Sequence, residues 1–356
     1  MRATKDMAQN YPLKISQRPL WFFDNEEFWR SCHPFLLARG YQLRPRYDPD
    51  WNPSWTKEGE IFFQAEHNIP SMKEAVLDAT RIADGKKVVL KRIESDHPEI
   101  GICRHLQSLR DDPRNRTIPI LDFLVLPETR WTIIVMPYAR RFTFPPFHCP
   151  NEFIEAMTQY LEGLQFMHDN NIVHFDIAPQ NMLMDESEVV PRGSHFALPE
   201  THHAKLAFFY WRDRCSVGPT QYYYIDFGLS LYFPEGKESA RHLGTLRTFP
   251  TIPELSDDVP YNPFYVDIYQ LGLTMQRVIN DYYGLEDFLP VAVKMLVLDP
   301  QARPEPRASL EHMRSIASKI SPSRLSGQIW EKNVGYWKKL SRWLWGGFPF
   351  EPGRHC

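Results

Sequence analysis

Three oxygen-bearing side chains stand out in the segment HFDIAPQNMLM and in the IDFG that follows further along the chain. Asp176 and Asn181 have the spacing D-x-x-x-x-N, and Asp226 follows a short apolar run. Carboxylate and amide oxygens are the ligands that Mg²⁺ prefers, and a carboxylate also orients a hydroxyl for attack on phosphate. The spacing therefore suits a magnesium phosphate site in which one acid orients an acceptor hydroxyl.

The elements that must position these residues are short strands and one long helix. The run NEFIEAMTQYLEGLQFMHDN has apolar residues at the spacing of a core-facing helix, with Asn151 as its expected N-cap. NMLM and YYYI predict two short strands, and the mixed stretch 185–221 between them reads as an insertion in a hairpin. The tail run IWEKNVGYWKKLSRWLWGG predicts an amphipathic basic helix that starts near Trp330.

Upstream, the pattern changes to strands. AVLDATRIADGKKVVLKRI predicts a hairpin that turns at Asp84-Gly85, and 118–125 and 131–136 predict a second strand pair. A helix is expected near 25–37. Strands first and helices afterwards predict an α+β protein with a small β-rich lobe and a larger helical lobe. We divide the chain into an N-terminal extension (1–50), the small lobe (51–138), the helical lobe (139–320) with its insertion at about 185–221, and a C-terminal tail (321–356).

Composition narrows the class of protein. The chain has 356 residues, of which 43% are hydrophobic and 24% charged, and this is globular rather than disordered. Lys and Arg total 41 against 44 Asp and Glu, so no overall field recruits nucleic acid. The five cysteines never form C-x-x-C, which argues for reduced thiols. Without a signal peptide or apolar span, we expect a cytoplasmic protein.

The ordered motifs resemble those of a eukaryotic protein kinase, and the likeness extends over roughly residues 75–313. His174-Phe175-Asp176 stands at the catalytic-loop motif, Asn181 at its metal-binding asparagine, and Asp226-Phe227-Gly228 at the second magnesium motif. The resemblance implies a bilobal kinase-like fold with ATP and Mg²⁺ as cofactors. It also implies that Asp176 orients the acceptor hydroxyl and that Asn181 and Asp226 hold the metal.

The same resemblance assigns further roles. Strand alternation places Lys91 on one face with Val89 and Ile93, and the likeness implies that Lys91 aligns the ATP phosphates. The adenine would lie between Val89 and Leu183. Met136 would be the gatekeeper beside the adenine, and Pro137 to Ala139 would form the hinge between the lobes.

The likeness also assigns structural roles. His174, Cys103 and Phe227 would stack in a regulatory column of side chains. Glu254 would pair with Arg303, and Asp267 would lie in the central buried helix of the large lobe.

Several positions depart from the kinase pattern. The segment EGEIFFQAEHNIPSMKE contains Gly59 as its only glycine, so the glycine-rich phosphate loop is degenerate. Phe175 replaces the arginine that clamps a phosphorylated activation segment, and Ala178 and Gln180 leave one expected phosphate-contacting cation absent. Glu99 either pairs with Lys91 or forms a capping box with Asp96.

Three functional hypotheses therefore stand. The first is a divergent protein kinase, similar to those numerous in fungi, with an acceptor protein that the sequence does not identify. The second is a pseudokinase that acts as an interaction scaffold, and the third is a small-molecule kinase, against which the later motifs argue. Two further segments have a structural explanation. We expect the insertion at 185–221 to be a solvated loop rather than a zinc site, and the C-terminal tail to dock on the large lobe rather than on a membrane. The residues weighed for zinc are His195, His202, His203 and Cys215.

Overall fold

The computed structural model describes residues 24–51, 73–202, 209–246, 251–333 and 335. Among these residues, two compact units are formed. The first is drawn from the described residues of 24–95, 120–138 and 194–209, and the second from those of 96–119, 139–193 and 210–335. Gly59 and the tail beyond residue 335 lie outside the described residues, as does His203.

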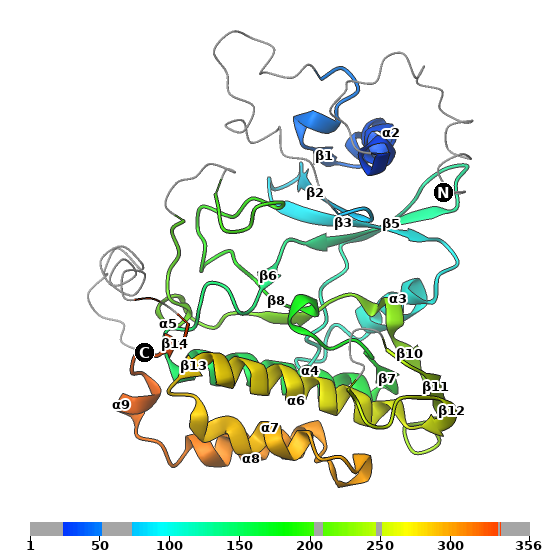
Figure 1. The fold of residues 1–356 in the computed structure, drawn as a ribbon. Coiled ribbons are helices and arrows are strands. Elements are labelled where there is room, and N and C mark those ends of the chain that lie inside the picture. Colours follow the sequence, from blue (N-terminus) through cyan, green and yellow to red (C-terminus); the bar gives the residue numbers. More distant parts are fainter. Residues whose placement is uncertain (1–23, 52–72, 203–208, 247–250, 334, 336–356) are drawn as a thin grey trace. The chain divides into compact units, whose positions relative to one another are not determined.

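The first unit is built on a five-stranded antiparallel sheet (Figure 1). Its order is β1 (Tyr41–Leu43), β2 (Val76–Arg81), β3 (Lys87–Glu94), β5 (Trp131–Pro137) and β4 (Asp122–Val125). The predicted hairpin is confirmed, since β2 and β3 pair Thr80 with Lys87 and Gly85 adopts φ +69 in the turn. The second strand pair is also confirmed, but β4 begins at Asp122 rather than at Ile118.

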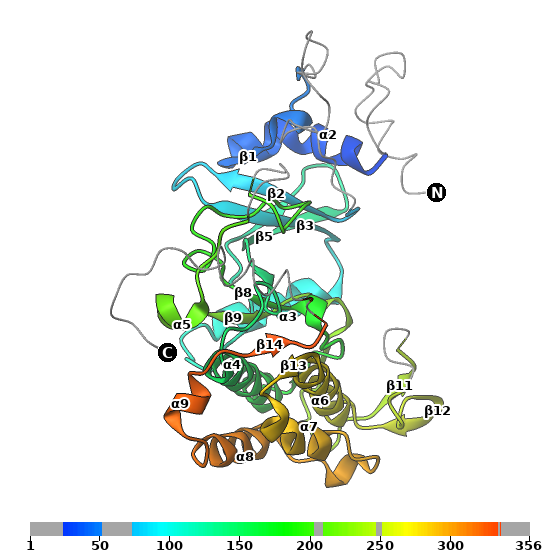
Figure 2. The same ribbon diagram turned by 60° about the vertical axis from the view of Figure 1, so that its left-hand side comes forward.

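The predicted helix near 25–37 is confirmed as α2 (Asp24–Ala38), which covers one face of this sheet (Figures 1 and 2). Trp29 and Leu36 of α2 are buried with Val88 and Leu90 of β3. The extension also supplies the edge strand β1 and the 3-10 turn η2 (Pro45–Tyr47). Residues 24–47 therefore contribute side chains to the core of the first unit. The three-residue strand β1 is held by its non-local pairing with β2.

The second unit is mainly helical. Its long helices α4 (Pro150–Asp169) and α6 (Pro263–Asp281) pack on each other and on the shorter helices α8 (Pro306–Ala317) and α7 (Leu289–Met295), respectively (Figure 2). The expected hairpin after the catalytic loop is present as β8 (Met182–Met184) paired with β9 (Tyr222–Tyr224). Together the two units confirm an α+β kinase-like fold.

The remaining elements are short. In chain order they are α3 (Pro98–Ser108), β6 (Arg140–Arg141), β7 (Ile172–Val173), η6 (Pro179–Asn181), α5 (Arg214–Val217), η7 (Phe227–Leu229), β10 (Leu231–Tyr232), β11 (His242–Gly244), β12 (Ser256–Tyr261), β13 (Tyr282–Tyr283), η8 (Glu286–Phe288), η9 (Pro300–Ala302), α9 (Pro322–Leu325) and β14 (Trp330–Glu331). Within the described parts of the chain, no helix has the length and apolar character needed to cross a bilayer.

Some local expectations are wrong. The N-cap of α4 is Cys149, not Asn151, because Pro150 takes the first helical position, where its missing N–H costs nothing. Trp330 does not start a helix but pairs with Tyr283 in a two-stranded ladder. Cys32, Cys103 and Cys149 are free and buried, whereas Cys215 is disulfide-bonded, so the expectation of reduced thiols is wrong for Cys215.

Candidate functional site

The loop between β7 and η6 is held by two buried side chains of α6. Asp267 accepts hydrogen bonds from the backbone N–H groups of His174 (2.8 Å) and Phe175 (2.7 Å). Gln270, one helical turn further on, accepts from the N–H of Ile177 (2.9 Å) and donates to the carbonyl of Phe175 (3.0 Å). Gln270 was not among the predicted site residues, although its i+3 spacing from Asp267 places both on one helix face. These four bonds fix the backbone on both sides of Asp176.

Asp176 is therefore presented on a rigid loop. One carboxylate oxygen, Oδ2, accepts from Nδ2 of Asn181 at 2.8 Å, and the same amide donates to the Asp176 carbonyl at 2.9 Å. The other oxygen, Oδ1, is buried and has no hydrogen-bond partner among the described residues. Burial raises the pKa of Asp176, and so, more weakly, does the charge of Asp226, while His174 and the Asn181 bond oppose this rise.

Asp226 and Asn181 are brought together by a short backbone link. The N–H of Ile225, next to Asp226, donates to the carbonyl of Asn181 at 3.0 Å. Asp226 itself has the left-handed backbone conformation (φ +66, ψ 75), and Phe175 on the neighbouring loop has φ +68. For residues other than glycine such conformations cost about 1–3 kcal/mol each and concentrate at functional sites.

The donor set fits a magnesium ion. The amide nitrogen of Asn181 is used by Asp176, which leaves the amide oxygen on the opposite side of the group. Together with the Asp226 carboxylate, this amide oxygen supplies hard oxygen donors, the type that Mg²⁺ selects. The three residues predicted for metal and hydroxyl chemistry thus belong to one unit and lie on adjoining segments.

The expected regulatory column is partly visible. The rings of His174 and Phe227 lie 5.2 Å apart, and α3, which carries the buried Cys103, packs on η7. A Cβ on Gly228 would lie 3.3 Å from Oδ1 of Asp226 and 3.4 Å from Oε2 of Glu99, so glycine leaves room for both carboxylates.

Glu99 does not form the capping box that the sequence allowed. The helix α3 starts at Pro98, and its N-cap is His97, whose Nδ1 accepts from the Glu99 N–H at 3.2 Å. Asp96 therefore lies outside the cap position. Lys91 belongs to the first unit and Glu99 to the second, so their pairing stays a prediction.

The expected nucleotide contacts are distributed over both units. In β3, Val88 and Leu90 are buried toward α2, whereas Val89 and Lys91 are half-buried on the other face, as strand alternation predicts. Met136 and Pro137 end the adjacent β5, where they pair with Val89 and Val88. Ala139 and Leu183 belong to the second unit.

The helical unit contains the ion pair that the resemblance implied. Both nitrogens of the Arg303 fork bond to Glu254, at 2.5 and 2.8 Å, and Arg303 also donates to the carbonyls of Tyr265 and Val297. A bidentate, buried pair of this kind fixes the end of the activation segment relative to α6.

Phe175 stands in an aromatic cluster that sequence reasoning did not foresee. Its ring lies 5.0 Å from that of His242 in β11 and 6.5 Å from that of Tyr261 in β12, and the last two are cross-strand partners. Burial lowers the pKa of His242, so its ring is neutral at pH 7. We name these three residues the aromatic clasp.

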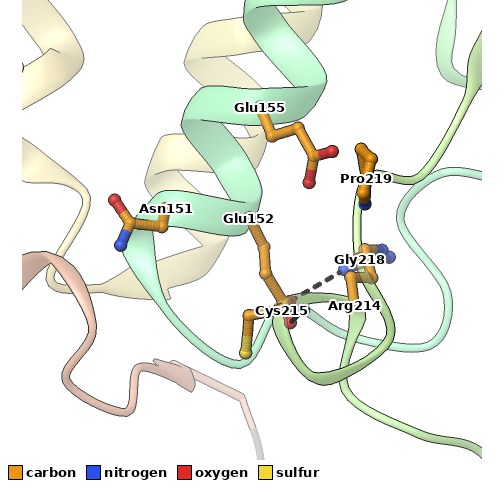
Figure 3. A pocket seen from close by; sticks show the side chains of 7 residues that line it. All are labelled: Asn151, Glu152, Glu155, Arg214, Cys215, Gly218 and Pro219. Atoms are coloured by element: carbon orange, nitrogen blue, oxygen red, sulfur yellow. Dashed lines mark hydrogen bonds and ion pairs between the residues drawn. The ribbon is translucent and has the colours of Figure 1, made fainter. Parts of the chain in front are cut away.

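A separate pocket of about 370 Å³ lies beside the start of α4 (Figure 3). Arg214 and Glu152 form a buried ion pair here (3.3 Å), and burial raises the pKa of Glu155, whose carboxylate lines the same pocket. Cys149, Glu152 and Cys215 offer ligand atoms within 4.8 Å of one another, but Glu152 already bonds to Arg214 and to the Cys215 N–H. No residue predicted for phosphate chemistry lines this pocket.

Among the described residues, no group of possible metal ligands includes His195 or His202. His195 belongs to the first unit and Cys215 to the second, and the His202 ring stacks on Phe209 at 4.7 Å. The expectation of a solvated loop is nevertheless wrong for His195, which is 1% exposed and accepts from the Leu198 N–H through Nδ1.

Comparison with known proteins gives the family. A probable casein kinase II subunit alpha homolog of Encephalitozoon cuniculi (strain GB-M1) is 24% identical over 199 residues, which cover 55% of this chain and 52% of that protein. The putative serine/threonine-protein kinase R436 of Acanthamoeba polyphaga mimivirus is 24% identical over 277 residues, which cover 65% of this chain and 86% of that protein. The chain thus spans about half the length of the first of these relatives. Residues 74–288, well over half of the chain, match the protein kinase domain, and the chain therefore belongs to the protein kinase family.

Proposed function

We propose that this member of the family is a catalytically active protein kinase that transfers the γ-phosphoryl group of ATP to a protein hydroxyl. Asp176 orients the acceptor hydroxyl, and Asn181 and Asp226 hold Mg²⁺. When bound, the ion bridges the phosphates and neutralises charge that develops on them. The acceptor protein and the chain's location in the cell stay predictions.

The observation that carries this proposal is the state of Asp176. Its loop is fixed by Asp267 and Gln270, its Oδ2 is held by Asn181, and its Oδ1 is buried without a partner. A buried polar atom without a partner costs free energy, so its persistence favours a ligand or substrate that completes it. A carboxylate with a structural role alone would instead be paired through both oxygens.

The nucleotide contacts follow from the family and extend the proposal to the first unit. Lys91 on β3 would bind the α/β-phosphates, with Val89 and Leu183 against the adenine and Met136 as gatekeeper. Pro137 has no N–H but keeps its carbonyl, so the Ala139 N–H is the proposed backbone donor to the base.

Calorimetric titration with ATP and Mg²⁺ tests the nucleotide site. Wild-type protein should bind, and Lys91→Ala and Asp226→Ala should each lose most of that affinity. Lys86→Ala and Asp258→Ala are matched controls, because both side chains are exposed. Loss of binding in the two site variants alone supports the proposal, whereas equal binding by all five proteins would overturn the assigned residues.

A second candidate function is a non-catalytic interaction module. It is favoured by Ala178 and Gln180, since the first is buried and uncharged and the second exposed, so neither supplies the expected cation. The same titration separates the candidates: wild-type protein that binds no nucleotide at millimolar ATP would favour the module.

Replacing Asp176 by asparagine should lower activity and raise stability together. The pKa of Asp176 is raised in the folded protein, so the stabilisation from its proton is present below the unfolded pKa of about 4 and is lost as pH rises. At pH 7 the ionised carboxylate therefore opposes folding. Asp176→Asn should increase Tm at pH 7, but not at pH 3, and lower kcat by about 10²–10⁴-fold, the range for a general base. A Tm that falls at pH 7 would contradict this reading of the site.

A further inference from the structure

The insertion between β8 and β9 does more than lengthen a hairpin. Ser194–Phe209 is part of the first unit, although the residues on both sides, Gly193 and Tyr210, belong to the second. Ser194, His195 and Phe196 at its start are buried. Because these side chains are buried in the first unit, the segment contributes to the structure of that unit. Its contacts identify the part of the sheet that it stabilises.

Ser194 bonds to two neighbouring strand ends. Its carbonyl accepts from the Lys87 ammonium at the start of β3, and its Oγ shares a hydrogen bond of 2.9 Å with the Tyr138 hydroxyl. Tyr138 follows directly after β5. Ser194 is fully buried and both bonds are partly buried, and a hydrogen bond is electrostatically stronger away from water than in it.

Aromatic packing reinforces these bonds. The ring of Phe196, which is 8% exposed, meets the Tyr138 ring edge-on at 6.4 Å, and the Lys73 ammonium lies 5.2 Å from its centre. The Lys87 ammonium lies 5.2 Å from the centre of the Tyr138 ring. Tyr138 is thus in contact with Phe196, Ser194 and Lys87 through its ring and hydroxyl.

The segment keeps its shape through its own hydrogen bonds. The His195 N–H donates to the Thr201 carbonyl at 2.8 Å, and the Thr201 N–H donates to the Leu198 carbonyl at 2.9 Å. His195 Nδ1 accepts from the Leu198 N–H at 3.2 Å. Residues 194–201 therefore form a compact turn that presents Ser194 and Phe196 in fixed positions.

What this turn holds is the end of the β3–β5 ladder. Pro137 pairs with Val88, and the Tyr138 N–H donates to the Lys87 carbonyl at 3.3 Å, a long bond at the point where the ladder stops. We propose that residues 194–201 are a built-in clamp on Tyr138, so that Phe196 and Tyr138 are positioning residues for the hinge. The consequence for nucleotide binding rests on the proposed function, since Met136 to Ala139 are its proposed adenine contacts.

Hydrogen exchange without nucleotide tests the clamp directly. Phe196→Ala and Tyr138→Phe should each speed amide exchange at positions 136 and 138 and at 87–88, while exchange in α4 stays at the wild-type rate. Loss of the single hydroxyl bond in Tyr138→Phe should speed it by about 2- to 10-fold, as a net hydrogen bond of 0.5–1.5 kcal/mol requires. Leu198→Ala is the matched control, because that side chain lies in the same turn but is 41% exposed.

The outcomes are separable from those of the nucleotide site. Faster exchange in both clamp variants, together with weaker binding of ATP and Mg²⁺, supports the clamp and its effect on the nucleotide. Faster exchange in a protein whose wild type binds no nucleotide supports the clamp and overturns only the proposed function. Exchange at positions 136 and 138 that matches that of Leu198→Ala in both variants overturns the clamp.

Discussion

Asp267→Ala is expected to destabilise the helical unit by about 2–6 kcal/mol, because it leaves two buried backbone N–H groups without acceptors at about 1–3 kcal/mol each. Those groups belong to His174 and Phe175, and the His168 ring, 3.1 Å from Oδ2, loses its partner as well. Since a whole domain is stable by only about 5–15 kcal/mol, this one carboxylate accounts for a large part of the total. On the proposed function, phosphoryl transfer should be lost at the same time, because the loop that carries Asp176 loses its anchor.

Urea denaturation measures this effect without relying on activity. Asp281→Ala is the matched control, since Asp281 lies at the other end of the same helix and is exposed. If Asp267→Ala yields no folded protein, Asp267→Asn provides the measurement, because asparagine keeps one acceptor oxygen and presents a donor to the second N–H. An unfolding midpoint for either Asp267 variant equal to that of Asp281→Ala would show that the carboxylate does not hold the loop.

Sequence patterns correctly predicted those elements that can be recognised from a few neighbouring residues. The Asp84-Gly85 turn, the apolar spacing of α4 and the short apolar runs of β8 and β9 can each be recognised within a few neighbouring residues, and all these elements are present. The same holds for the face of β3 that carries Lys91, since strand alternation depends only on the chain itself. The order of the kinase motifs then supplied the fold.

Features that depend on distant parts of the chain were not predictable in this way. The strand β1 is three residues long, and only its partner β2 identifies it. Likewise, Ser194 and Phe196 have no pattern of their own, and their role follows from Lys87 and Tyr138, far away in sequence. The N-caps predicted for α4 and α3 were wrong because proline occupies the first helical position of each helix. The N-cap is therefore the residue before it, Cys149 in α4 and His97 in α3.

Phe175→Ala is expected to release the activation segment while the rest of the helical unit stays folded. The Phe175 ring is 4% exposed and belongs to a buried apolar cluster with residues of that segment, including Ala240, Leu246 and Ile252. Removing a buried phenylalanine side chain costs about 3–5 kcal/mol. We expect this loss of stability to affect β11 and β12 most. These strands contact the Phe175 ring through His242 and Tyr261 of the aromatic clasp.

Hydrogen exchange and limited proteolysis locate the change. Exchange at 242–244 and 256–261 should rise strongly in Phe175→Ala and less in Phe175→Leu, which keeps most of the apolar volume. Phe153→Ala is the matched control, because this buried ring packs on Phe147 and Phe288 and not on the segment. It should lower global stability without selective release of β11 and β12.

Treatment of wild-type protein with a phosphatase gives the sharper test of what holds the segment. An apolar ring needs no phosphate partner, so protection of β11 and β12 should be the same before and after treatment. Phe175→Arg should release the segment in unphosphorylated protein, since it places a charge in the apolar cluster without a buried partner. If protection of β11 and β12 instead disappears when wild-type protein is dephosphorylated, a phosphorylated hydroxyl holds the segment. The aromatic clasp would then contribute packing but would not position the segment.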